Sequence, residues 1–174
     1  RGLDAKRKGM VVLFLHEAKL INTPKPIINL KDADLRDADL SRTRLTGASL
    51  TGANLGGANL SFAHMINVVL IEADLNRARL NSAFLFDANL SGANLSHANL
   101  SVANLSHGTK LSLANLNNAI LRSANLSNTD LSDVHLLDAD LSLADLTNAI
   151  ITAEQLADIK SLLGATMPDG KKHD

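Results

Sequence analysis

Leucine recurs at every fifth position along most of the chain. Leucine or a near equivalent occupies residues 30 to 105 in steps of five and, after one inserted residue, residues 111 to 151 in the same steps. Alanine precedes nearly every one of these by two positions, and Ala-Asn-Leu or Ala-Asp-Leu triplets recur from Ala33 to Leu146. The chain is therefore mostly an array of five-residue repeats.

A period of five excludes one long α-helix and favours a stacked coil. Five residues turn a helix by about 500°, so successive leucines would point in different directions. Three extended residues followed by a two-residue turn would instead place Ala and Leu inward and the intervening Asn or Asp outward. The two remaining positions are rich in Ser, Thr, Gly, Asn and Asp, which favour turns. The pattern predicts a solenoid filled with Leu and Ala.

These repeats, which read Ala-(Asn/Asp)-Leu-x-x, resemble the pentapeptide-repeat family over residues 28–151. The resemblance implies an all-β solenoid: a right-handed quadrilateral β-helix with four units per coil, or about six coils for this chain. Residues 27–151 are therefore predicted to form the β-helix. Within it, one outward column would read Asp34, Asn54, Asp74, Asn94, Asn115 and His135, and in this column Asp never stacks directly on Asp.

Both ends of a stacked coil need covering, because their backbone groups and leucines are otherwise exposed. Residues 1–26 are predicted to form an N-terminal capping helix and linker, with a helix breaker at 23–26. The helical face expected to be buried comprises Val11, Phe14, Leu15, Ala18 and Ile21.

Residues 152–174 are predicted to form a C-terminal capping helix and a polar tail. Thr152 and Gln155 have capping-box spacing, and Gly164 is suited to ending the helix, which is expected over 153–163. We therefore expect helical caps at both ends, with residues 165–174 as a mobile tail.

The inserted residue lies within 106–110. Because the register is kept on both sides, we expect a bulge at a corner, with Gly108 providing the unusual backbone dihedral. A functional loop is the alternative interpretation.

The composition argues against catalysis and against nucleic-acid binding. The 174 residues include no Cys, Trp or Tyr and only four Phe, which removes thiolate chemistry and most stacking platforms. A net charge of −1 does not favour binding to a phosphate backbone. The histidines lack metal-ligand spacing, with His64 and His135 expected on outward strand positions and His97 and His107 at corners. We expect no enzyme, cofactor, metal, small-molecule substrate or nucleic-acid partner.

An apolar patch interrupts the polar outward positions in the second and third coils. Residues 20 apart should stack, which places Phe84 over His64 and Phe86 over Ile66. Such a patch is typical of a contact surface, although the N-terminal helix could instead fold back onto it. The candidate interaction patch consists of Phe62, His64, Ile66, Val69, Ile71, Phe84 and Phe86.

The sequence thus predicts a non-enzymatic rigid scaffold that binds an unknown protein partner or associates with itself. The family resemblance alone implies the alternative of a DNA-mimicking inhibitor or protector of a type II topoisomerase. Such rods are strongly acidic, whereas residues 27–151 carry eight basic and twelve acidic residues.

The N-terminal segment carries a basic cluster of Arg1, Lys6, Arg7 and Lys8. This cluster and the following helix resemble the segment that joins a membrane anchor to a cyanobacterial pentapeptide-repeat domain, which implies an anchor upstream of residue 1. The alternative is that the four basic side chains are simply solvent-exposed charges at a chain terminus. No apolar run in the sequence is long enough to span a bilayer, so the chain as given is expected to be a soluble domain.

Overall fold

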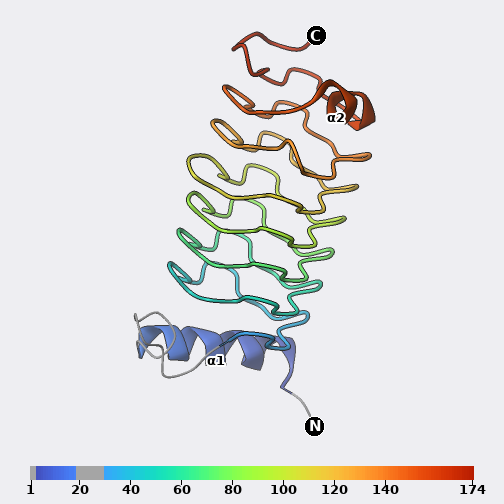
Figure 1. Ribbon diagram of the computed structural model, residues 1–174. Helices are drawn as coiled ribbons and strands as arrows, with labels where there is room; N and C mark the ends of the chain where they lie inside the picture. The colour runs from blue at the N-terminus through green and yellow to red at the C-terminus, as the bar shows by residue number, and fades with distance from the viewer. Residues whose placement is uncertain (1–2, 19–29) are drawn as a thin grey trace.

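The computed structural model describes residues 3–18 and 30–174, and it shows a tall stack of coils (Figure 1). Helix α1 (Ala5–Glu17) lies across the first coil, and helix α2 (Ala153–Asp158) lies beside the last ones. Between residues 30 and 152, all of them described, the chain forms short extended segments joined by two-residue turns. This arrangement is the β-solenoid that the five-residue period predicts.

Parallel backbone pairing stacks the coils on one another. Asp34 pairs with Asn54 and Asn54 with Asp74, and this separation of 20 residues recurs along the stack. Across the insertion the separation becomes 21, as for Asn89 with Lys110. Twenty residues correspond to four five-residue repeats, so the pairing agrees with four units per coil.

The repeated Ala and Leu side chains fill the interior, which confirms their inward assignment. Leu95 and Ala98 are both 0% exposed, as are most of their equivalents in other coils. Thr43 replaces Ala at one inward position and stays buried because its hydroxyl donates a hydrogen bond of 2.6 Å to the Leu40 carbonyl. A buried hydroxyl is tolerated here because it has a partner.

The extra residue of the insertion is absorbed at a corner. His107 and Gly108 both have positive φ, at 48° and 68°, whereas an ordinary corner has one such residue. Gly108 therefore supplies the predicted dihedral. Thr109 then returns to an inward position, where its hydroxyl donates to the carbonyls of Leu85 and Ser106.

Helix α1 packs on the first coil through a different face from the predicted one. Val12 is 2% exposed, whereas Val11 and Phe14, both predicted to be buried, are exposed. The cause is the close approach of Gly9, where a Cβ atom would lie 1.8 Å from the Asp39 carbonyl oxygen. Only glycine allows this contact, and it turns the Gly9–Val12 side of the helix toward the coil.

Polar contacts hold α1 in this orientation. The Asp39 amide donates to the Ala5 carbonyl at 3.1 Å, and Lys8 Nζ donates to the Arg36 carbonyl at 3.0 Å. Of the remaining residues predicted on the buried face, Leu15 is partly buried and Ala18 is exposed. Ile21 and the breaker at 23–26 lie outside the described residues.

The C-terminal helix is shorter than predicted. It ends at Asp158 rather than at residue 163, although its capping box is present as expected. The Thr152 hydroxyl accepts a hydrogen bond from the Gln155 amide at 3.2 Å, and Gln155 Oε1 accepts one from the Thr152 amide at 2.9 Å.

After α2 the solenoid resumes instead of ending in an unpaired polar tail. Ser161 pairs with Asp140 and Thr166 with Asp145, while Thr166 also pairs antiparallel with Lys172. The physical reason is the open edge of the preceding coil, whose backbone groups these residues satisfy. Gly164, which was predicted to end the helix, forms a corner with a φ of 69°.

Candidate interaction surface

The outward polar residues form ladders that stabilise the stack. The predicted column from Asp34 to His135 is paired from coil to coil along its whole length. Asn94 Nδ2 donates to Asp74 Oδ1 at 2.9 Å, while Asn94 Oδ1 accepts from the Ser96 amide at 3.2 Å. These side chains thus bond both the neighbouring coil and their own turn, which accounts for their abundance without a catalytic role.

At the first coil, charge pairing strengthens the same ladder. Hydrogen bonds from Arg36 hold the pKa of the Asp34 carboxyl well below its usual range. The two side chains meet at 2.8 Å between Arg36 Nη2 and Asp34 Oδ2. The negative charge of Asp34 is therefore paired.

Two aromatic rings at the centre of the predicted patch stack on one another. His64 and Phe84 occupy paired outward positions in neighbouring coils, and their ring centroids lie 4.8 Å apart with an interplanar angle of 23°. Phe84 remains 40% exposed and Phe62, at the adjacent corner, 44% exposed. The rod thus presents a preformed aromatic pair beside a third ring.

The other four members of the patch are half-buried: Ile66, Val69, Ile71 and Phe86. The Asn67 amide donates to the Phe86 carbonyl at 3.3 Å, which places Phe86 next to the corner formed by Ile66 and Asn67. Described residues of α1 pack on the first coil and leave Phe62 and Phe84 exposed.

Arginines border the aromatic rings. The Arg42 guanidinium lies 5.1 Å from the centroid of Phe62, within the range of a cation–π contact. Arg44 is exposed and pairs with His64, so it continues the column of the aromatic pair. These two arginines are absent from the patch predicted from the sequence. Their positions, 20 residues before Phe62 and His64, nevertheless predict that they stack next to those residues in the neighbouring coil.

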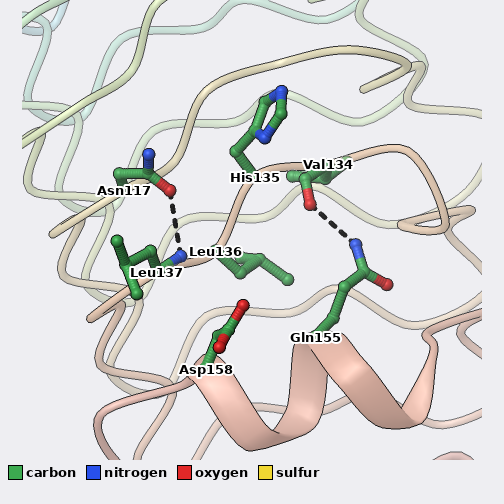
Figure 2. A pocket seen from close by; sticks show the side chains of 7 residues that line it. All are labelled: Asn117, Val134, His135, Leu136, Leu137, Gln155 and Asp158. Atoms are coloured by element: carbon green, nitrogen blue, oxygen red, sulfur yellow. Dashed lines mark hydrogen bonds between the residues drawn. The ribbon is translucent and has the colours of Figure 1, made fainter.

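A groove lies between α2 and the coils (Figure 2). The Leu137 amide donates to Asn117 Oδ1 at 2.9 Å, and Gln155 Nε2 donates to the Val134 carbonyl at 2.7 Å. His135 and Asp158 also line this groove. The amides of Asn117 and Gln155 are thus engaged in structural bonds.

The histidines stand where the repeat predicts them. His64 and His135 are exposed at paired outward positions, whereas His97 and His107 are exposed at corners with positive φ. Among the described residues, no three His, Asp or Glu side chains gather closely enough to hold a metal ion. Neither described helix is long and apolar enough to cross a membrane.

Comparison with known proteins assigns the repeat. The family model for pentapeptide repeats matches eight copies within residues 28–61, 53–91, 85–109 and 109–148. Comparison with curated proteins gave no significant match.

Several solved structures are similar to the chain. HetL from the cyanobacterium Nostoc, involved in heterocyst differentiation regulation, is 28% identical over 92% of this chain and 98% of that one, with a TM-score of 0.36. A pentapeptide repeat protein from the cyanobacterium Cyanothece is 36% identical over 62% of this chain and 66% of that one, with a TM-score of 0.35. QnrB1, a plasmid-mediated fluoroquinolone resistance protein, is 17% identical over 80% of this chain and 84% of that one, with a TM-score of 0.34.

The family model covers most of the chain, and the matched repeats are the ones whose Ala and Leu side chains fill the coil. The chain therefore belongs to the pentapeptide repeat family.

Proposed function

We propose that this chain is a rigid, non-enzymatic rod, a right-handed quadrilateral β-helix of about six coils, that binds another protein through the candidate interaction patch. The observation that carries the proposal is the exposed stack of His64 and Phe84.

The exposed rings serve no evident purpose within the coil. Most outward positions hold Asn, Asp or Ser, which bond neighbouring coils and turns, whereas a phenyl ring cannot replace those hydrogen bonds. Ordered aromatic side chains at the surface are typical anchors of protein interfaces, because burying them releases water at little cost in side-chain entropy. The stack fixes Phe84 before a partner arrives.

The chemistry of the patch favours a partner segment with a carboxylate beside an apolar side chain. Arg42 and Arg44 supply positive charge next to the rings, and neither forms an ion pair within the described residues. An acidic side chain could bond to a guanidinium while its apolar neighbour covers Phe84.

Ion pairing of acidic side chains argues against DNA mimicry. A mimic needs free negative charge along its faces, but Asp34 is bound by Arg36 and Asp140 by Arg122 at 2.6 Å. We expect no inhibition of topoisomerase supercoiling at micromolar concentrations of this chain.

Selection from a library of displayed peptides tests the proposed partner. We expect enrichment of peptides in which Asp or Glu adjoins an aromatic or aliphatic residue, and loss of their binding by the variant Phe84→Ser. Ile120→Ser is a matched control, because Ile120 also occupies an outward paired position and is also 40% exposed. Binding that survives Phe84→Ser, or that falls equally in the control, would contradict the proposal.

A further inference from the structure

Four bulky apolar residues occupy corner positions with positive φ: Phe62, Val102, Leu113 and Leu143. Their φ values lie at 60° or 61°, in the left-handed region that disfavours large side chains and disfavours β-branched ones most. Most other such corners of the described chain carry Gly, Asn, Asp or another polar residue.

Three of these four residues share one edge of the rod, here called the corner ridge: Phe62, Val102 and Leu143. The Phe62 amide donates to the Asn81 carbonyl and the Val102 amide to the Arg122 carbonyl, each in the corner of the next coil. The three ridge residues lie 40 and 41 residues apart, which is two coils, or about 10 Å along the rod in each step. Val102 thus stands midway between the other two.

The ridge combines backbone strain with exposure. Val102 is 60% exposed and Leu143 62% exposed, so most of each side chain faces water. A strained residue persists when something else requires it, and such residues concentrate at functional sites. The strain and the exposure together point to contact with another molecule.

We propose that the corner ridge joins two copies of this chain in an antiparallel dimer. A two-fold axis through Val102, perpendicular to the rod, brings Val102 against Val102 of the second copy. Because the steps on either side are equal, the same axis places Phe62 against Leu143 of the second copy. The ridge is thus complementary to itself, as a two-fold interface requires.

The flanking charges favour the antiparallel arrangement over the parallel one. Antiparallel packing sets His64 beside Asp145 of the second copy, since the two lie two coils from Val102 on opposite sides and on the same face. Parallel packing would instead set Arg42 against Arg42 and Asp145 near Asp140 of the second copy. In the antiparallel dimer the like charges of Arg42 and of Lys172 of the second copy come near one another only at the outer ends of the interface. There both long side chains can extend into water.

This dimer goes beyond the proposed function: it covers Phe62 at the edge of the candidate interaction patch and leaves Phe84, on the adjoining face, open to a partner. The axis keeps the face carrying His64 and Phe84 on the same side in both copies. One dimer would therefore present two partner-binding patches on one side, which raises avidity for a partner with two binding segments.

Sedimentation equilibrium of the full chain tests the dimer. We expect a reversible monomer–dimer equilibrium, with a dissociation constant that Val102→Asn raises at least about tenfold. Asn tolerates positive φ, so the same variant should not lower the melting temperature of the rod. Leu113→Asn is the matched control, since Leu113 has a φ of 60° and is 67% exposed but lies on a different corner.

Cysteine cross-linking tests the direction of packing, because the native chain contains no Cys. Under mild oxidation we expect Val102→Cys to link to itself, and a mixture of Phe62→Cys and Leu143→Cys to link to one another. Linkage of Phe62→Cys to itself would show parallel packing and overturn the proposal. A wild-type chain that stays monomeric at about 100 μM, or a control that dissociates as readily as Val102→Asn, would also overturn it.

The two proposals fail separately. Val102→Asn should dissociate the dimer and retain peptide binding to each patch, whereas Phe84→Ser should lose peptide binding and keep the dimer.

Discussion

Replacement of Gln155 by Met should weaken the C-terminal end of the rod. Gln155 Nε2 donates to the Leu131 carbonyl at 2.6 Å and to the Val134 carbonyl at 2.7 Å, and Figure 2 shows the second of these bonds. The side chain thus satisfies carbonyl groups that a further strand would otherwise bond. Its Oε1 also accepts from the Thr152 amide at 2.9 Å, which closes the capping box. Met has a similar length but can make none of these bonds.

The magnitude follows from counting what is left unpaired. Loss of the acceptor for the Thr152 backbone amide costs about 1 kcal/mol. Leu131 keeps a second donor, the Val134 amide at 3.0 Å, so its carbonyl adds little. The Val134 carbonyl has no other donor among the described residues, and Val134 is buried. Leaving this carbonyl without a hydrogen bond costs about 1 to 3 kcal/mol. We therefore expect Gln155→Met to lower the free energy of unfolding by about 2 to 4 kcal/mol.

Urea unfolding followed by circular dichroism measures this change, and Thr152→Ala serves as the control. That variant removes the hydroxyl that accepts from the Gln155 backbone amide and leaves every bond of the Gln155 side chain in place, so it should cost only about 1 kcal/mol. An equal loss in both variants would refute the reasoning, because it would show that the bonds from Gln155 to the coil contribute nothing.

Three further predictions concern the core, the insertion and acid stability. Leu95→Ala should cost about 2 to 5 kcal/mol, because Leu95 is fully buried and the coil cannot collapse, whereas Asn94→Ser should cost about 1 kcal/mol or less; the reverse order on urea unfolding would contradict the inward assignment. Deletion of Gly108 should restore the five-residue corner and leave the β-type circular dichroism unchanged, and loss of folded protein would show that the bulge is needed. Burial opposes the charge of Asp140, yet hydrogen bonds from Ser142 and Arg122 lower the pKa of its carboxyl. The charged carboxyl therefore stabilises the fold fully above its unfolded pKa of about 3.9, and this stabilisation is lost as the pH falls through the folded pKa. Asp140→Asn should accordingly show a smaller drop in melting temperature between neutral and acidic pH than the wild type.

The sequence predicted the coil well because its interior is dictated by one repeated geometry. Each Leu and Ala occupies a slot that neighbouring coils define, so the spacing alone identifies what is buried. The same reasoning located the corner at Gly108 and the capping box at Thr152, since both depend on local chemistry.

The ends were harder to predict because their contacts are not repeated. Amphipathic spacing placed Val11 and Phe14 inward, but the approach of Gly9 to Asp39 rotates the helix, and only the tertiary contact reveals this. Similarly, Leu162 and Met167 are five residues apart, as in the repeat, but helix α2 interrupts the register before them. This last repeat was therefore predicted to be a helix and a tail.

The candidate surfaces differ from the core in how far a sequence pattern determines them. An inward Leu is required by every coil, so its presence indicates packing and nothing about a partner. An outward or corner residue is limited only by turn geometry and ladder bonding, and Gly, Asn, Asp or Ser satisfies both. Phe84 fails the second requirement, because its side chain makes no ladder hydrogen bond, and Val102 fails the first, because it strains its turn. Because the interior leaves so little choice of residue, these departures at the surface are the positions on which the two binding proposals rest.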